Sequence, residues 1–357
     1  MAKRIGILTA GGDCPGLNAT IRGVVKALYQ KLDNVEIYGI VDGFKGLIEG
    51  DYRKMEPSDF YGILTAGGTI LGTARTPYKR MKIIENQVDK VACMKQNYKK
   101  MRLDCLLVLG GNGTHKTANL LHQEGLNVIG LPKTIDNDIW GTDVTFGFHT
   151  AVDIGTEVVD RIHTTASSHK RVMVIEIMGN KAGWLTLYTG VAGGADVILI
   201  PEIPYNIKKV IKAVERRAQK GRGFSIIAVA EGAYNLEEAD MKKKERAEKR
   251  AHNGYTTATN RIAHDIMKMA GFDTRVVVPG HFVRGGTPSS YDRVLASQFG
   301  VYAADLVSKG VFGVTVAKRN NAITHNPLEL VAGKTKLVPA DDQMIFTARS
   351  LGISFGD

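Results

Sequence analysis

The chain has 357 residues, a length that suits two domains of ordinary size. Its 44% hydrophobic and 23% charged residues are ordinary for a soluble globular protein. The net charge is +11, but much of the excess lies in residues 208–222 and 242–250, with no RNA-binding aromatics or helix-turn-helix pattern beside it. We therefore expect solvated helix faces there and no nucleic-acid partner.

The chain shows no segment for export or for membrane insertion. No apolar run reaches transmembrane length, and the apolar stretch near the N-terminus is too short for a signal peptide. Cys14, Cys93 and Cys105 have neither metal-ligand spacing nor the pattern of a disulfide framework. We expect a cytoplasmic protein without a membrane partner.

The first predicted element is a strand over residues 4–10, followed by Gly11 and Gly12 and by helical spacing over residues 18–31. This order places backbone N–H groups at a helix N-terminus, where they can bind an anion. The loop matches neither G-x-G-x-x-G nor G-x-x-x-x-G-K-[ST], so a Rossmann-type dehydrogenase has no support. A plain turn is the alternative, although one glycine would suffice for it.

A second glycine pair follows the predicted strand over residues 35–41. It opens the segment 66–75, which ends in Arg75 after a run of small residues. A flexible loop that ends in arginine suits phosphate contact, because the guanidinium fork matches phosphate oxygens. An arginine on the surface without a ligand is the alternative.

The same strand, glycine and helix pattern recurs in the middle of the chain. A strand is predicted over residues 103–109, a glycine-rich loop over 110–114 and a helix over 115–124. Loops of this kind lie at the carboxyl ends of parallel strands, where open α/β sheets bind their ligands. The two loops therefore indicate a shared site for phosphates.

An acidic turn follows the next predicted strand, over residues 126–131. Asp136, Asp138 and Asp143 lie within eight positions, with Lys133 beside them. Neighbouring carboxylates raise one another's pKa and a nearby cation lowers it, so such a cluster can separate a base from a metal ligand. A turn rich in Asp and Asn is the alternative.

The second half of the chain repeats the plan. Strands are predicted over residues 171–178, 197–201, 225–230, 275–279 and 313–317, with helices over 148–164, 186–192, 208–220, 256–269 and 292–309, and a long charged helix that ends at Arg250. The strand ends carry Asn180, Glu231, His281 and Arg284. The pattern predicts two closely packed α/β lobes with mainly parallel sheets.

Six motifs in order and spacing resemble those of the bacterial-type phosphofructokinases. They are LTAGGDCPGLNATIRG, GGTILGTAR, LGGNGT, PKTIDND, IEIMGNKAG and PGHFVRGG, and the resemblance extends from Ile5 to about Ala317. It implies two Rossmann-like three-layer α/β/α lobes and phosphoryl transfer to O1 of fructose 6-phosphate. It also implies a donor lobe of residues 1–147 and 282–333 and a sugar lobe of residues 148–281 and 334–357.

The resemblance implies a role for each matching residue on the donor side. Asp136 looks like the general base for the sugar 1-hydroxyl, with Asp138 and Thr134 as its neighbours. Arg75 and Gly12 look like the groups that stabilise and support the transferring phosphoryl group. The residues implied to contact ATP are Gly11, Gly12, Phe44, Arg75, Thr76, Gly111, Asn112, Gly113 and Thr114.

The resemblance also implies a sugar site that is shared between subunits. The residues implied to contact fructose 6-phosphate are Thr134, Ile135, Asp136, Arg171, Met178, Gly179, Asn180, Glu231, Arg275, His281 and Arg284. In the family, the arginines that match Arg171 and Arg275 reach across from a neighbouring subunit. A homotetramer with shared active sites is therefore expected.

Three departures from the family pattern affect these expectations. Asn112 replaces the metal-binding aspartate, so Mg2+ is expected to rely on substrate phosphates and on Asp136 or Asp138. Asn180 replaces an arginine of the sugar site, and Lys26 replaces an effector-site arginine. Asn112 and Asn180 motivate a further hypothesis, a regulatory or sugar-phosphate-binding protein without activity, although such a protein would not need Asp136.

Two positions bear on the phosphoryl donor. Pyrophosphate-using members carry an aspartate where this chain has Gly113, and that aspartate fills and charges the space of the ATP α-phosphate. The same members carry lysine at the position of Lys133, where ATP-using bacterial members often have glycine. An aspartate at position 113 would exclude ATP by its size and charge, whereas a lysine at position 133 only adds a cation that either donor can tolerate. We therefore give Gly113 more weight and predict ATP as the donor, with pyrophosphate as the alternative.

Overall fold

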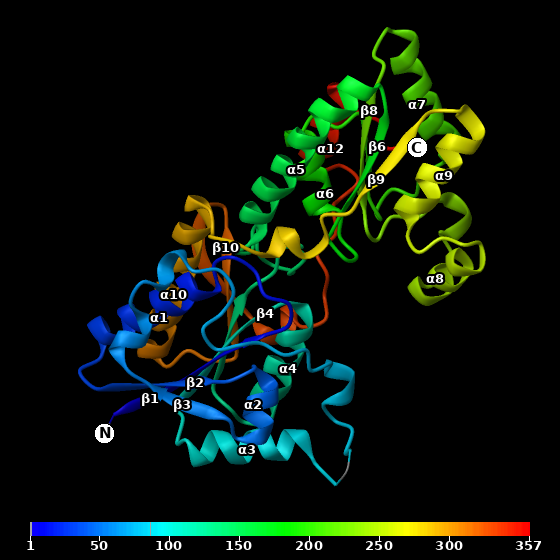
Figure 1. Ribbon diagram of the computed structural model, residues 1–357. Coiled ribbons are helices and arrows are strands. Elements are labelled where there is room, and N and C mark those ends of the chain that lie inside the picture. The colour runs from blue at the N-terminus through cyan, green and yellow to red at the C-terminus, as the bar shows by residue number, and fades with distance from the viewer. Residues whose placement is uncertain (1, 86) are drawn as a thin grey trace. The chain divides into compact units, whose positions relative to one another are not determined.

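A computed structural model describes residues 2–85 and 87–357 of the chain (Figure 1). The described residues divide into two compact units. The first unit contains residues 2–150 and 284–336, and the second contains residues 151–283 and 337–357. Each unit is therefore completed by a stretch of chain that is distant in the sequence.

A seven-stranded sheet forms the centre of the first unit. Its strands are β1 (Lys3–Ala10), β2 (Val35–Ile40), β3 (Tyr52–Met55), β4 (Cys105–Gly110), β5 (Val128–Pro132), β10 (Val314–Arg319) and β11 (Ala322–Pro327). They lie in the order β11-β10-β5-β4-β1-β2-β3, with β3 and β11 as antiparallel edge strands and parallel pairing between all the others. The two middle strands β4 and β5 carry no polar side chain and are buried along their whole length, as is usual where helices cover both faces of a sheet.

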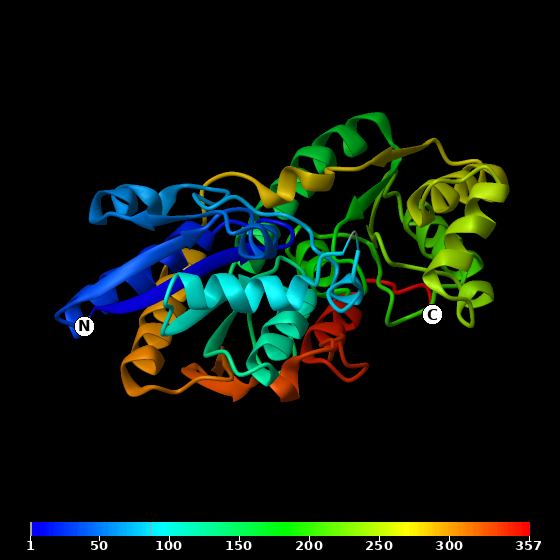
Figure 2. The same ribbon diagram turned by 90° about the horizontal axis from the view of Figure 1, so that it is seen from below.

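Helices complete the first unit as a three-layer α/β/α structure. They are α1 (Leu17–Lys31), α2 (Phe44–Glu49), α3 (Lys90–Lys100), α4 (Asn112–Gln123), α10 (Ser290–Lys309) and α11 (Leu328–Val331). One core joins Leu8 of β1 and Leu106 of β4 to side chains of α2, α3 and α4, and α3 lies beside α4 in both views (Figures 1 and 2). Helices α1 and α10 pack so closely that a Cβ on Gly300 would lie 2.6 Å from the Thr20 carbonyl oxygen.

The second unit is built on a four-stranded parallel sheet in the order β7-β8-β6-β9. Its strands are β6 (Val172–Ile177), β7 (Val197–Leu199), β8 (Ser225–Ala230) and β9 (Thr274–Val277). Its helices are α5 (Phe148–His169), α6 (Trp184–Ala192), α7 (Ile207–Gln219), α8 (Lys243–His252), α9 (Ala258–Ala270) and α12 (Gln343–Ser350). Figure 1 shows α7 and α9 on one side of this sheet and α5 and α6 on the other.

The α/β class with mainly parallel sheets is confirmed, whereas some of the predicted elements differ. The sequence patterns did not predict α2, β3, α3, β11 or α12. The charged helix expected to end at Arg250 is observed as α8, but it does not extend back toward β8, because a separate 3₁₀ turn at Leu236–Glu238 precedes it. In the described part of the chain, no helix is long and apolar enough to cross a membrane.

Candidate functional site

Three strand ends lie side by side at the carboxyl edge of the first sheet. Ala10 at the end of β1 pairs with Gly110 at the end of β4, which pairs with Pro132 at the end of β5. The chain order reverses between β1 and β4, since β2 lies on one side of this pair and β5 on the other. Such a reversal leaves a crevice beyond the strand ends where α/β proteins bind ligands.

The loop after β1 makes a close contact with Arg284. Gly11 has φ +84, a left-handed conformation that glycine adopts without strain. A Cβ on Gly12 would lie 2.6 Å from Nη1 of Arg284, and that nitrogen donates to the Asp13 carbonyl oxygen at 3.0 Å. Arg284, predicted as part of the sugar clamp, is therefore placed by the structure against the loop predicted to hold the donor phosphate.

The ammonium group of Lys133 is also part of this loop contact. Lys133 is buried, and its Nζ donates to the carbonyl oxygen of Gly12. Burial lowers the pKa of Lys133, and the charge of Arg284 lowers it further, while Cys14 and Asp136 raise it. The side chain therefore ties the end of β5 to the loop after β1 and is held close beneath it.

The loop between β4 and α4 leaves space at Gly113. A Cβ at this glycine would meet no atom within 4 Å, and its φ lies outside the left-handed region. Thr114 is buried, and its hydroxyl lies 3.5 Å from the Ala10 carbonyl oxygen. The loop is therefore anchored by Thr114 and open at Gly113.

The amide of Asn112 is oriented by its donor side. Its Nδ2 donates to the Lys334 carbonyl oxygen at 2.7 Å and to Oγ1 of Thr335 at 3.1 Å. Its Oδ1 is buried and has no hydrogen-bond partner among the described residues. An amide oxygen can coordinate Mg2+. Oδ1 of Asn112 can therefore serve as a metal ligand, although it lacks the negative charge of the aspartate that it replaces. In the described ranges, no group of three or more His, Cys, Asp or Glu side chains is arranged to hold a metal.

His115 fixes the loop from below. Its Nδ1 lies 2.9 Å from the Gly111 carbonyl oxygen, and its Nε2 lies 2.8 Å from Oγ1 of Thr315. A carbonyl oxygen only accepts, so Nδ1 carries the proton and the Thr315 hydroxyl donates to Nε2. Burial lowers the pKa of His115 to about 4.

We expect this histidine to make the protein sensitive to acid. Between pH 6.5 and about 4, His115 is protonated in the unfolded chain but neutral in the folded protein. The free energy of unfolding therefore decreases as the pH is lowered through this range. The full shift corresponds to about 3 kcal/mol of unfolding free energy. Urea unfolding at a series of pH values should show this loss, and it should shrink by a similar amount in His115→Asn. An equal loss in the variant would contradict the assignment.

The acidic turn after β5 is held by its own side chains. The Asp136 N–H donates to Oγ1 of Thr134 at 3.0 Å, and the Thr145 N–H donates to Oδ1 of Asn137 at 3.1 Å. Asp138 is buried, and this burial raises the pKa of its carboxyl group. Ile135 is fully buried, so only its backbone can face a ligand.

One carboxylate and one lysine of this region have structural roles. The exposed Asp143 accepts the Asn320 backbone N–H at 2.8 Å, so it braces a turn. Nζ of Lys336 donates to Oδ1 of Asn137 at 3.1 Å and to the Thr142 carbonyl oxygen at 2.8 Å. Sequence reasoning missed Lys336 because it lies in the weakly patterned tail, far from the turn it supports.

The remaining donor-side residues differ in exposure. Arg75 is exposed and Thr76 is half-buried, and both lie in the irregular segment before the 3₁₀ turn at Tyr78–Arg80. Phe44 begins α2 and is buried in the core that α2 shares with β1 and β4. Its ring therefore lies in the hydrophobic core, and its contact with ATP stays a prediction.

The carboxyl edge of the second sheet carries one part of the predicted sugar site. Ile177 pairs with Ala230, so Met178 and Gly179 follow β6 beside Glu231, which follows β8. Oε1 of Glu231 accepts the Asn180 backbone N–H at 2.6 Å, and Asn180 has φ +54. His281 is exposed in the 3₁₀ turn after β9.

Arg171 and Arg275 lie at the opposite, amino edge of the same sheet. Arg171 precedes β6 and Met178 follows it, so the strand separates them by roughly 20 Å at about 3.3 Å per residue. Arg275 pairs with Met173 near the start of β6. The two arginines therefore cannot reach a sugar phosphate bound beside Met178 and Glu231 of the same chain.

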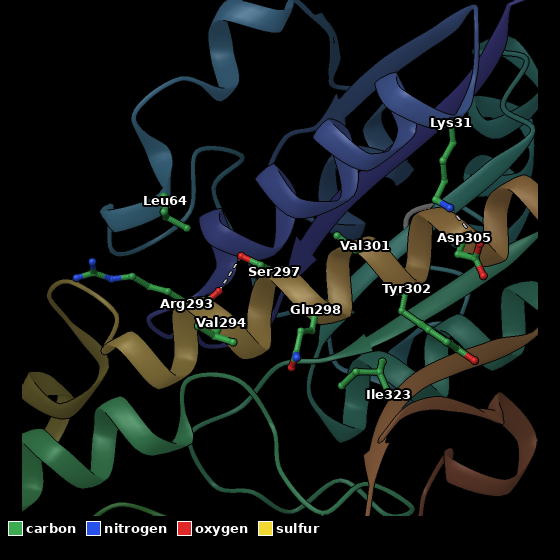
Figure 3. A pocket seen from close by; sticks show the side chains of 10 residues that line it. All are labelled: Lys31, Leu64, Arg293, Val294, Ser297, Gln298, Val301, Tyr302, Asp305 and Ile323. Atoms are coloured by element: carbon green, nitrogen blue, oxygen red, sulfur yellow. Dashed lines mark hydrogen bonds and ion pairs between the residues drawn. The ribbon is translucent and has the colours of Figure 1, made fainter. Parts of the chain in front are cut away.

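The apolar hollow on the outer face of α10 contains none of the predicted site residues. Figure 3 shows it between α10, Leu64 and Ile323, and its volume is about 620 Å³. Val294 and Val301 are exposed in it, and an ion pair of 3.2 Å between Lys31 and Asp305 lies among its lining residues. We assign this hollow no part in the site.

The fold and the site define the class of the protein. Two glycine-rich loops and an acidic turn meet at the switch point of a mainly parallel sheet, which is where α/β proteins bind phosphorylated ligands. The phosphofructokinase family model, described as "Phosphofructokinase", matches residues 4–307. The chain belongs to this family.

Individual relatives agree with this assignment. The chain is 57% identical over 359 residues to the "ATP-dependent 6-phosphofructokinase" of Spirochaeta thermophila, covering 99% of this chain and 98% of the relative. It is 47% identical over 354 residues to the "ATP-dependent 6-phosphofructokinase 3" of Bacteroides thetaiotaomicron, covering 99% and 100%. The solved phosphofructokinase of Saccharomyces cerevisiae is 31% identical with a TM-score of 0.79, and the match covers 92% of this chain but only 45% of the yeast chain.

Proposed function

We propose that this protein is an ATP-dependent 6-phosphofructokinase, which transfers the γ-phosphoryl group of ATP to O1 of fructose 6-phosphate in glycolysis. The names of its full-length relatives support the reaction. The open space at Gly113 is the structural observation that carries the choice of donor, because it leaves room beside the loop for a nucleotide.

The proposed chemistry divides between the loops of the first unit. Asp136 takes the proton from the sugar 1-hydroxyl, and Thr134 holds the backbone of Asp136 in place. The loops at Gly11, Gly12 and Gly111 to Thr114 receive the donor phosphates with their N–H groups, and Arg75 stabilises the charge on the transferring group. This division suits phosphoryl transfer, which depends on positioning and charge stabilisation.

Mg2+ completes the proposed donor site. We propose that Asn112 contributes its buried Oδ1, oriented by Lys334 and Thr335, with the donor phosphates and Asp136 or Asp138 as further oxygen ligands. When bound, the ion neutralises part of the phosphate charge. Turnover that persists unchanged after chelation by EDTA would contradict this proposal.

Lys133 has a proposed role that differs from donor selection. Its ammonium group is hydrogen-bonded to Gly12 and buried, so it acts as a support for the donor loop. A lysine engaged in this way is compatible with ATP as well as with pyrophosphate. The proposed choice of ATP over pyrophosphate therefore rests on Gly113.

The two edges of the second sheet support a shared sugar site. We propose that Met178, Gly179, Asn180, Glu231 and His281 contact the sugar bound to their own chain. Arg171 and Arg275, roughly 20 Å away across the sheet, serve the site of another copy in a homotetramer. A sedimentation experiment that finds a fully active monomer would contradict this proposal.

The proposed partners are fructose 6-phosphate and ATP, with no nucleic acid and no membrane. We propose a cytoplasmic location, because both substrates belong to cytoplasmic sugar metabolism. Cell fractionation that recovers the activity in a membrane fraction would overturn this placement.

The donor is tested by a coupled assay with fructose 6-phosphate and Mg2+, in which ATP and pyrophosphate are compared at equal concentration. We expect turnover with ATP and at most a trace with pyrophosphate. Turnover with pyrophosphate alone would show that Lys133 decides the donor. Absence of turnover with both, together with binding of fructose 6-phosphate, would favour a sugar-phosphate-binding protein.

A further inference from the structure

Arg171 and Arg275 share one carboxylate, that of Asp273. Nε of Arg171 donates to Oδ2 of Asp273 at 2.7 Å. Nη1 of Arg275 donates to the other oxygen, Oδ1. Two cations, one just before β6 and one in β9, are therefore joined through a single acidic side chain, which no motif of the sequence analysis contained.

The sheet register explains why these three residues meet. Val172 of β6 pairs with Thr274 of β9, so the preceding residues, Arg171 and Asp273, lie opposite each other. Asp273 and Arg275 are two positions apart, and side chains at that spacing extend from the same face of a strand. The Val172 N–H donates to the Asp273 carbonyl oxygen at 3.0 Å, which holds the backbone of Asp273 against β6.

The hydrogen bonds of Asp273 leave the phosphate-binding groups available. Arg171 uses its inner Nε, and its two Nη groups make no hydrogen bond within the described part of the chain. Arg275 uses Nη1 for Asp273 and for the Thr274 carbonyl oxygen at 3.0 Å. Paired guanidinium groups with free N–H groups are suited to bind a phosphate monoester through several oxygens at once.

The charge of this cluster also favours a phosphate. Its hydrogen bond from Arg171 and the charge of Arg275 hold the pKa of Asp273 below its usual range, so the carboxylate is ionised at neutral pH. Two guanidinium groups and one carboxylate carry a net positive charge. The side chains are partly exposed, at 30% for Arg171, 47% for Asp273 and 51% for Arg275, so a ligand can reach them.

We propose that Asp273 is a positioning residue for the 6-phosphate of the sugar substrate, which holds Arg171 and Arg275 side by side before the substrate binds. This inference rests on the proposed function. Asp273 does not touch the phosphate; it removes freedom from two long side chains whose ordering would otherwise weaken binding. It also limits the repulsion between the two cations.

The proposal is tested by comparing the steady-state kinetics of Asp273→Asn with those of the wild type, with ATP as the donor. We expect the KM for fructose 6-phosphate to rise at least about tenfold, while kcat at saturating sugar and the KM for ATP stay within about threefold. Asp273→Glu, which keeps the charge, should recover part of the loss. Asp273→Ser provides a second neutral variant if the asparagine variant is insoluble.

The matched control is Asp305→Asn. Asp305 also bridges two cations on the surface, Lys31 at 3.2 Å and Lys309 at 2.7 Å, but it belongs to the first unit and to none of the predicted site residues. We expect this variant to keep the wild-type KM. A fall in KM for the Asp273 variants would show that the carboxylate competes with the phosphate, and an unchanged KM would show that it does not position the arginines; either result overturns the proposal.

A measurement without substrate separates this inference from the proposed function. Phenylglyoxal modifies free guanidinium groups, and peptide mass spectrometry can follow Arg171 and Arg275 individually. We expect both arginines to react several times faster in Asp273→Asn than in the wild type. If the variant reacts faster but the protein does not use fructose 6-phosphate, Asp273 positions the two arginines and the proposed substrate is wrong. Equal reaction rates in the variant and the wild type would show that Asp273 does not position the arginines.

Discussion

Replacing Asp136 with asparagine is expected to lower kcat by about 10²–10⁴-fold, the range that a general base contributes. Asparagine keeps the size of the side chain but cannot accept the proton of the sugar hydroxyl. The backbone hydrogen bond from residue 136 to Oγ1 of Thr134, at 3.0 Å, does not depend on the carboxylate, so the turn should keep its shape. The dissociation constant for fructose 6-phosphate, measured by calorimetry without donor, should change little.

Asp143→Asn is the control for this experiment. Asp143 belongs to the same acidic stretch, but it is exposed, and its carboxylate accepts the Asn320 N–H at 2.8 Å. An amide oxygen can accept the same hydrogen bond, so we expect nearly full activity. If Asp136→Asn retained activity as Asp143→Asn does, the proposed base would be wrong.

Gly113→Asp is expected to lower kcat/KM for ATP by about 100-fold or more. A carboxylate beside donor phosphates meets like charge, which costs several kcal/mol, and each ~1.4 kcal/mol is a factor of ten. The protein itself tolerates the side chain, because a Cβ at Gly113 meets no atom within 4 Å. An acidic residue in the first turn of α4 (Asn112–Gln123) is also favourable for the helix dipole. The thermal midpoint should therefore not fall.

Two further variants separate size from charge at this position. Gly113→Asn matches aspartate in volume without the charge, and Gly113→Ala adds only the Cβ. We expect a smaller loss for asparagine than for aspartate and little loss for alanine. Unchanged use of ATP by Gly113→Asp would mean that Gly113 does not face the nucleotide, and donor choice would then have to be sought at Lys133.

The central strands could be predicted closely because their signal is local. The strand predicted over residues 225–230 is observed as β8 (Ser225–Ala230), since a continuous apolar run is required where both faces of a strand are buried. The edge strand β3 (Tyr52–Met55) was missed because only Met55 of its four residues is buried. Short edge strands carry too little apolar periodicity to stand out from loops.

The charged segment between β8 and Arg250 is rich in residues that favour helices, but only its last part, from Lys243, is an α-helix. Glu238 is fully buried, and it is paired with Arg250 at 2.7 Å and with Arg261 at 3.2 Å. Asn235 and Glu238 form the cap of a 3₁₀ turn there, so the segment is not one continuous helix. The ion pairs join residues that are distant in the sequence, so helix propensity alone could not reveal the break.

The sequence by itself determined the α/β class, the phosphofructokinase resemblance and the loops that carry the candidate chemistry, because strand, glycine and helix signals lie within single segments. Only the tertiary structure decided how those loops meet: the pairing of Ala10, Gly110 and Pro132 aligns three strand ends, and Lys133 reaches the Gly12 carbonyl oxygen across them. Only the tertiary structure joined Arg171 to Asp273, because the strand register places the residues before β6 and β9 opposite each other. Distances across a sheet depend on strand order and register, which no single segment encodes.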